Sequence, residues 1–164
     1  MTKKLKSKFS AYQIDQSGKI EQTRVDCVIC LSNGSTDTIQ INAKTKRQIQ
    51  EIFRRHGQIR NYVLFTFCAL ISIIIKRNSK LPQITIDKEY LGKEPVIKEI
   101  LLEMLKASNP IPEIRFSHIG RKVNAHSQAY LTYTKKVKPR KIITLKEVII
   151  EIKKTEVGKR LKNA

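Results

Sequence analysis

Aromatic residues, cysteine and acidic residues are all scarce in this sequence. It has no Trp, and aromatic residues make up only 6% of the chain, which disfavours a surface built to stack successive bases. Its three cysteines are too few, and odd in number, for the disulfide framework of a small secreted domain. The composition therefore disfavours both a base-stacking surface and a disulfide-rich secreted domain.

Long apolar runs are also missing. The most apolar stretch runs only from Tyr62 to Ile75, whereas a membrane-spanning helix needs about 20 residues. The basic residues at the start of the chain are not followed by the apolar region of a signal peptide. We therefore expect 62–75 to be a buried helix, and the protein to be cytoplasmic with no membrane partner.

Positive charge is what the sequence has in excess. Lys and Arg number 33 against 14 acidic residues, a formal net charge of +19. A compact chain with this charge repels itself unless a polyanion neutralises it, and nucleic acid is the natural candidate. Adaptation to heat or salt is the alternative interpretation, but it accounts for a high number of charges better than for charge of one sign.

Cys27 and Cys30 have the spacing of a metal knuckle, but their surroundings argue against one. They lie in an apolar run that is typical of a β-strand, where residues three apart point to opposite faces. No second cysteine pair exists to complete a zinc site. We predict no metal site at these cysteines.

Hydrophobic periodicity predicts one mixed α/β domain at 9–154, with basic tails at 1–8 and 155–164. Hydrophobic residues make up 40% of the chain, which is enough for a real core. We expect strands at 9–15, 20–31, 38–41, 81–87 and 113–118, and helices at 44–56, 61–77, 94–105, 124–133 and 145–153. This order predicts a five-stranded mixed sheet, beginning with three antiparallel strands and covered by helices.

Two of the acidic residues stand in unusual places. Asp15 and Asp87 each follow an apolar run, near the end of a strand that we expect to be central. A carboxylate there is costly unless a positive charge compensates it, and Mg²⁺ or Mn²⁺ does so because hard cations prefer carboxylate oxygens. Two such acids on neighbouring strands can share one metal ion or bridge two. The alternative for each residue is a turn cap.

The two aspartates stand in motifs that resemble those of the ribonuclease H-like superfamily. The motifs are YQIDQSG at 12–18 and ITID at 84–87, and the predicted order of elements is similar over roughly 9–135. In that superfamily a βββαβαβα core carries one catalytic Asp on the first strand and another at the end of the fourth. The resemblance implies a metal-dependent nuclease with Asp15 and Asp87 in its site.

Two further family positions differ in this chain. Many members have a Glu in the first helix, where this chain has Gln48, with Glu51 one turn away as a substitute or as a solvated helix residue. Many also have an acid in the helix after the fifth strand, where this chain has His126, which is similar to the Asp-Asp-His sets of the Piwi branch. The alternative for His126 is a partly buried, hydrogen-bonding histidine.

The resemblance thus implies that Asp15, Asp87 and His126 are catalytic residues and ligands of Mg²⁺ or Mn²⁺. Glu89, two residues after Asp87, is a further catalytic candidate, because it would point the same way if the strand continued. Its alternative is an acid that precedes the next helix.

Clusters of basic residues are the candidate nucleic-acid contacts. Backbone phosphates, of DNA, RNA or a hybrid, are their natural partners, because such contacts position a strand without reading its sequence. The candidates are Lys46, Arg47, Arg54, Arg55, Arg121, Lys122, Lys136, Lys138 and Arg140. A non-catalytic nucleic-acid-binding protein or ribonucleoprotein component remains the second functional hypothesis, and a peripheral membrane protein with basic tails is a weaker third.

Overall fold

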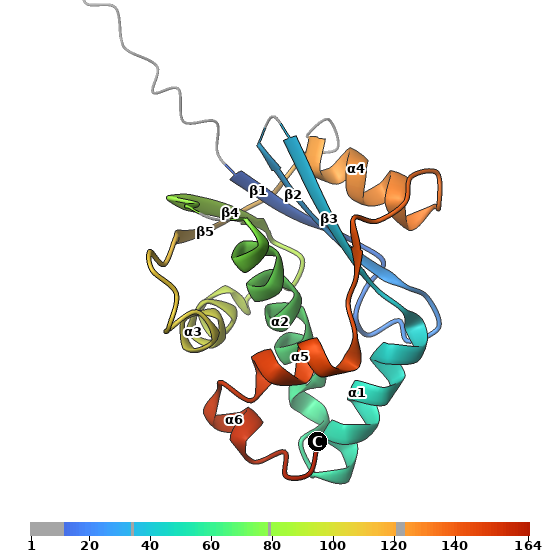
Figure 1. The fold of residues 1–164 in the computed structure, drawn as a ribbon, viewed down its shortest axis with the longest axis vertical. Helices are drawn as coiled ribbons and strands as arrows, with labels where there is room; N and C mark the ends of the chain where they lie inside the picture. Colours follow the sequence, from blue (N-terminus) through green and yellow to red (C-terminus); the bar gives the residue numbers. More distant parts are fainter. Residues whose placement is uncertain (1–11, 34, 79, 121–123) are drawn as a thin grey trace, which may run out of the picture.

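A mixed sheet of six strands forms the centre of the computed structural model, which describes residues 12–33, 35–78, 80–120 and 124–164 (Figure 1). The strands are β1 (Tyr12–Ser17), β2 (Cys27–Asn33), β3 (Ser35–Ile41), β4 (Gln83–Asp87), β5 (Glu113–Ser117) and β6 (Lys141–Ile142). Their order is β5-β4-β1-β2-β3-β6. The first three strands are antiparallel, β4 and β5 run parallel to β1, and β6 runs parallel to β3. The predicted mixed α/β fold is confirmed.

Two strands differ from the sequence prediction. Strand β2 begins at Cys27 instead of residue 20, because residues 18–26 form a turn-rich loop that leaves the sheet. Strand β6 adds a sixth member at the edge of the sheet, where its two residues pair with Ile39 and Gln40. Two residues are too short a stretch for an alternating hydrophobic pattern to indicate a strand.

The helices cover the sheet unequally. They are α1 (Ala43–Arg55), α2 (Tyr62–Arg77), α3 (Glu94–Met104), α4 (Asn124–Tyr133), α5 (Leu145–Ile152) and α6 (Glu156–Lys159), with a 3-10 turn, Ile59–Asn61, before α2. Figure 1 shows α4 on one face of the sheet, and α2, α3 and α5 on the other. Helix α4 contacts β1, β2 and β3, whereas α2 packs against β2, β3, α3 and α5. The main core lies on the α2 side.

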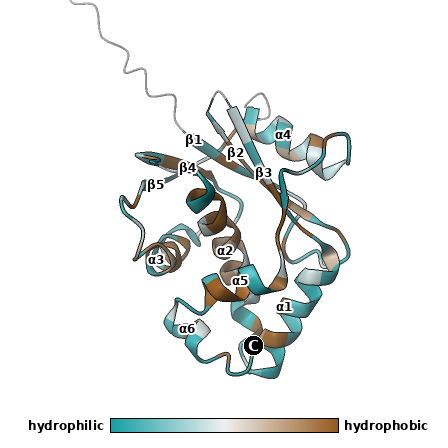
Figure 2. Cartoon of the chain, in the orientation of Figure 1, coloured by the Kyte–Doolittle hydropathy of each residue, from teal (hydrophilic) through white to brown (hydrophobic). Residues whose placement is uncertain are grey.

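Helix α2 is the core helix of the domain, and Figure 2 shows it as apolar through most of its length. The helical segment Ile59–Arg77 is long and apolar enough to cross a membrane by length and composition, yet 61% of its most apolar window is buried inside the protein. Helix α2 is apolar on most of its surface because other helices and strands surround it, as is usual for a helix buried in a core.

The three cysteines are free and buried. Cys27 belongs to the main core, whereas Cys30 packs with Val28 and Ala129 beneath α4. The two cysteines of the C-x-x-C motif therefore lie on opposite faces of β2, as the strand periodicity predicts. Burial raises the pKa of both thiols to about 12, which disfavours the thiolate form that binds metals.

Residues 155–164, which we expected to be a basic tail, are packed onto the domain. Thr155 caps α6 by accepting a hydrogen bond from the Gly158 N–H at 2.9 Å. Leu161 is only 1% exposed and belongs to the main core. The many basic residues of this segment suggested a solvated tail, although a few apolar residues such as Leu161 pack into the core. The predicted N-terminal tail, 1–8, lies outside the described residues.

Candidate metal centre and nucleic-acid surface

The two aspartates stand side by side at the centre of the sheet. Strand β1 is parallel to β4, and Ile14 pairs with Ile86, so the next residues along the strands are Asp15 and Asp87. Asp15 lies within β1, flanked by β2 and β4, and is only 4% exposed. Asp87 is the last residue of β4. The strand register therefore brings together two carboxylates that are 72 positions apart in the sequence.

Glu89 joins the aspartates in one cluster. One carboxylate oxygen from each of Asp15, Asp87 and Glu89 lies within 4.8 Å of the other two. The Glu89 N–H donates to the Asp87 carbonyl at 2.8 Å, which turns the chain tightly after β4. From the sequence, His126 is a stronger candidate ligand than Glu89. Only the spacing of two residues between Asp87 and Glu89 indicates that Glu89 belongs to this cluster.

Burial and mutual repulsion leave this cluster in need of positive charge. Burial raises the pKa of Asp15, and the nearby charge of Asp87 raises it further, against hydrogen bonds from the Gln16 N–H and His126. Burial likewise raises the pKa of Glu89, and the charges of Asp87 and Asp15 add to this effect, while Lys19 opposes it. A bound cation would remove both penalties, because an opposite charge favours the ionised carboxylate.

His126 contacts the cluster through Asp15. Its Nδ1 lies 2.7 Å from Asp15 Oδ2, and it reaches the strand from the first turns of α4. The other oxygen, Oδ1, accepts a hydrogen bond from the Gln16 N–H at 2.7 Å. Asp87 is anchored similarly, since its Oδ1 accepts from the Ile119 N–H at 2.7 Å. Within the described residues, His126 is not among the three side chains that converge within 4.8 Å.

The donor set fits a hard divalent cation. All three converging groups are carboxylates, which Mg²⁺, Mn²⁺ and Ca²⁺ prefer to softer ligands. A small recess beside them is lined by Ile14, Asp15, Gln16, Phe67, Ile86, Asp87 and Glu89. One of these lining residues, Gln16, has a buried side-chain oxygen, Oε1, that has no hydrogen-bond partner among the described residues. The three carboxylates could therefore hold a metal ion.

The two residues of α1 that stand near the family's Glu position are remote from this cluster. Gln48 and Glu51 line a surface groove that also includes Leu145 of α5. Glu51 accepts hydrogen bonds there from Arg54 at 2.6 Å and Arg55 at 3.0 Å. Neither residue is part of the carboxylate cluster.

Lys46 requires a correction, because it is not available to nucleic acid. It is 0% exposed, and its Nζ donates to the carbonyl oxygens of Lys19 at 2.8 Å and Gln22 at 2.7 Å. Burial lowers the pKa of this ammonium. The side chain holds the loop between β1 and β2 against α1. The position was misread because a lysine on a basic helix usually faces solvent, and only the tertiary fold shows that this one does not.

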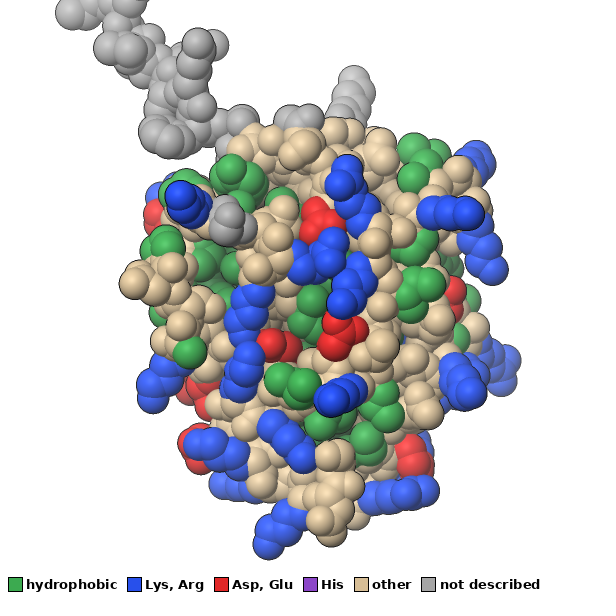
Figure 3. All heavy atoms as spheres, in the orientation of Figure 1, with side chains coloured by type: hydrophobic (Ala, Val, Ile, Leu, Met, Phe, Trp, Pro, Cys, Tyr) green, Lys and Arg blue, Asp and Glu red, His purple; other side chains and the backbone are tan. Residues whose placement is uncertain are grey.

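The other basic candidates divide into three groups. Arg47, Arg54 and Arg55 are exposed, but Arg47 donates to the Thr23 carbonyl at 2.8 Å and the other two pair with Glu51. Lys136, Lys138 and Arg140 are exposed after α4. Arg121 and Lys122 lie outside the described residues. Figure 3 shows Lys and Arg side chains scattered over the face seen in Figure 1, with a few acidic side chains among them.

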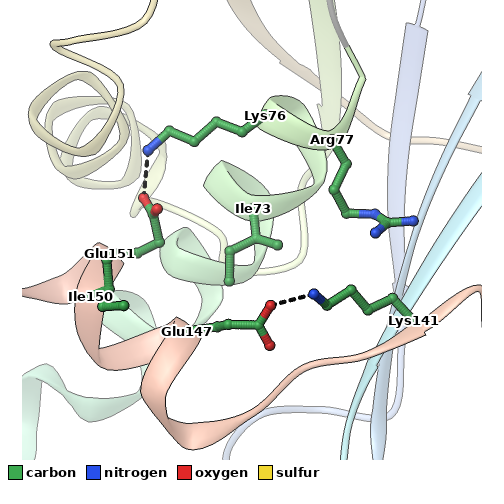
Figure 4. A pocket seen from close by; sticks show the side chains of 7 residues that line it. All are labelled: Ile73, Lys76, Arg77, Lys141, Glu147, Ile150 and Glu151. Atoms are coloured by element: carbon green, nitrogen blue, oxygen red, sulfur yellow. Dashed lines mark hydrogen bonds and ion pairs between the residues drawn. The ribbon is translucent and has the colours of Figure 1, made fainter.

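A separate pocket of about 260 Å³ lies between α2, α5 and β6 (Figure 4). Its lining includes two ion pairs, Lys76 with Glu151 and Lys141 with Glu147. Arg77, also in the lining, pairs with Asp37 at 2.9 Å. The cations of this pocket are thus held by carboxylates of the protein itself, and no residue is shared with the cluster around Asp15.

Comparisons with known proteins do not extend this description. No family model, no curated protein and no solved structure matches the chain.

Proposed function

We propose that this protein is a divalent-metal-dependent nuclease with a ribonuclease H-like fold, which hydrolyses phosphodiester bonds of nucleic acid. The observation that carries the proposal is the convergence of Asp15, Asp87 and Glu89 at the end of β4, in a strongly basic chain. The strand order β5-β4-β1-β2-β3, with β1 to β3 antiparallel, also has the form that the sequence resemblance implies.

The roles of the residues follow from their contacts. Asp15, Asp87 and Glu89 would hold Mg²⁺ or Mn²⁺, which when bound activates water and stabilises the leaving oxygen. His126 would position the Asp15 carboxylate by its contact with Oδ2. The Gln16 and Ile119 N–H groups would hold the aspartates in place, leaving their other lone pairs for the ligand role.

Nucleic acid is the favoured substrate because of charge. The formal net charge is +19, and exposed cations follow α4, the helix that carries His126. Phosphate contacts of this kind give salt-dependent affinity.

The first test is Mn²⁺ binding by calorimetry to the parent and to the double variant Asp15→Asn/Asp87→Asn. We expect binding by the parent and none by the double variant. The control is Glu113→Gln, which removes an exposed carboxylate from β5 and should leave binding unchanged. Labelled single-stranded DNA, duplex DNA, RNA and hybrid are then incubated with the parent and Mn²⁺. A parent that neither binds Mn²⁺ nor cleaves any of them would refute the proposal.

Non-catalytic binding of nucleic acid is the second candidate function. It is favoured because no carboxylate of α1 joins the cluster among the described residues: Gln48 is neutral, and Glu51 lines a separate surface groove. It predicts that affinity for nucleic acid falls steeply with salt and does not depend on divalent ions. Equal affinity at low and physiological ionic strength would exclude it.

A further inference from the structure

Gln16 is the most unusual polar residue of the sheet. It lies on β1 next to Asp15 and is only 8% exposed. Its Nε2 donates to the Tyr90 hydroxyl at 3.5 Å, and that hydroxyl in turn donates to Glu21 at 3.2 Å. The Tyr90 oxygen is therefore the acceptor of the amide N–H, which directs the amide oxygen of Gln16 elsewhere.

That amide oxygen is buried and unsatisfied. Gln16 Oε1 has no hydrogen-bond partner in the described part of the chain, although buried polar atoms are nearly always paired. Gln16 lines the same recess as Asp15, Asp87 and Glu89, whose ionised carboxylates can only accept hydrogen bonds. The carboxylates of this lining cannot donate to the amide oxygen, whereas a bound cation would interact favourably with both.

The sheet geometry allows Gln16 and Asp15 to reach one ion. Successive strand residues point to opposite faces, so Asp15 meets His126 on the α4 side while Gln16 meets Tyr90 on the other. Strand β4 ends at Asp87, level with Asp15, so beyond this level no β4 residue separates the two faces. An ion held by Asp15, Asp87 and Glu89 would lie beside the recess that Gln16 also lines.

We infer that the Gln16 amide oxygen is a direct, neutral ligand of the divalent cation held by Asp15, Asp87 and Glu89. The inference rests on the proposed metal centre and adds to it a residue outside the carboxylate set. A neutral oxygen extends the oxygen shell of a hard cation without adding to the charge of three carboxylates. Both Mg²⁺ and Mn²⁺ accept an amide oxygen as a ligand, so this ligand does not select one ion over the other.

The test measures Mn²⁺ affinity by the electron paramagnetic resonance signal of the free ion, without any substrate. Gln16→Met removes the amide oxygen at similar size, and we expect it to weaken Mn²⁺ binding about tenfold or more, as loss of a supporting group at a metal site does. Gln16→Glu, nearly isosteric and charged, is expected to bind Mn²⁺ more tightly than the parent. The matched control is Gln13→Met on the same strand, outside the recess, with unchanged affinity.

The outcomes separate this inference from the proposed function. If Gln16→Met binds Mn²⁺ as tightly as the parent while Asp15→Asn/Asp87→Asn loses it, the metal centre stands and the role of Gln16 is refuted. If the parent binds no Mn²⁺, the role of Gln16 is refuted, and the cleavage assay decides the proposed function. If circular dichroism shows that Gln16→Met is unfolded, Gln16→Glu decides: tighter binding supports the inference, and unchanged binding overturns it.

Discussion

His126 Nδ1 lies 2.7 Å from Asp15 Oδ2, and this contact ties helix α4 to the central strand β1 across 111 positions of the sequence. Helix α4 is held on its face of the sheet by a small apolar contact of Ala129 with Val28 and Cys30. The orientation of the Asp15 carboxylate therefore depends on how α4 is docked.

Replacing His126 tests whether it positions Asp15. We expect His126→Leu to lower metal-dependent cleavage about 10- to 100-fold, as removal of groups that orient metal ligands does. His126→Asn, which places an N–H near the position of Nδ1, should restore much of the loss if positioning is the role. A ligand or proton-transfer role predicts instead that Asn is as defective as Leu. Cleavage rates and Mn²⁺ affinity of both variants are measured together.

Lys46 is predicted to stabilise the protein and not to bind nucleic acid. Lys46→Met would remove the two hydrogen bonds that the buried ammonium donates to the carbonyls of Lys19 and Gln22, at a cost of about 2 kcal/mol in the free energy of unfolding. Urea denaturation measures this cost. Lys44→Met, on the exposed side of the same helix, is the control for stability. A larger loss of nucleic-acid affinity in Lys46→Met than in Lys44→Met would contradict the structural role.

The exposed cations that follow α4 are predicted to bind phosphates. We expect the triple variant Lys136→Gln/Lys138→Gln/Arg140→Gln to bind nucleic acid more weakly. On duplex DNA, the plot of log affinity against log salt should become shallower by about 0.9 for each phosphate that the variant no longer neutralises. Fluorescence anisotropy at several salt concentrations measures both quantities.

The control for this variant removes the same number of positive charges from a different part of the surface. Lys98→Gln/Lys106→Gln/Lys159→Gln alters three exposed lysines on or near α3 and α6. The same loss of affinity and slope in both variants would mean that net charge alone drives binding.

Glu151 is predicted to make stability depend on acid pH. Burial would raise its pKa, but hydrogen bonds from Lys154, Lys76 and Ser72, each at 2.8 Å, outweigh this and lower the pKa below its ordinary value of 4.5. Its stabilising contribution is therefore present above pH 4.5 and is lost as pH falls through the lowered pKa.

Glu151→Gln checks this linkage. Glu151 is only 6% exposed, and we expect the variant to lose about 1–3 kcal/mol at pH 7, less than for a fully buried pair because both lysines reach solvent. Below pH 4.5 the stabilities of variant and parent should converge. Thermal unfolding from pH 3 to pH 7 measures the difference, and a constant difference across that range would disprove the assignment.

Much of the fold could be predicted because its signals are local. The alternation of apolar residues indicated β3, β4 and β5, and the apolar stripe of 94–105 indicated α3. The start of β2 could not be predicted, since residues 20–26 run without a break into the apolar strand that follows them. They are held in a loop by Lys46 and by the hydrogen bond from the Ala43 N–H to Asp26. That competition is decided by contacts between distant segments.

The candidate site could be predicted only in part, for the same reason. Asp15 and Asp87 are recognisable because an acid at the end of an apolar strand is costly and therefore conspicuous. Glu89 carries a weaker signal. Gln16 carries none, because a glutamine in a strand is ordinary until its side-chain oxygen is seen to be buried with no partner among the described residues. The sequence suggested Glu51 as a catalytic acid and Lys46 as a phosphate contact. In the fold, Glu51 pairs with arginines and Lys46 donates to backbone carbonyls.

By itself the sequence determined the mixed α/β class, the excess of positive charge and the two strand-end aspartates. These depend on residue type and spacing along the chain. The tertiary structure alone decided which side chains share the recess at the end of β4 and which cations remain exposed. Burial and proximity arise when distant segments pack together, and both the cost of a buried charge and the gain from its partner depend on that packing.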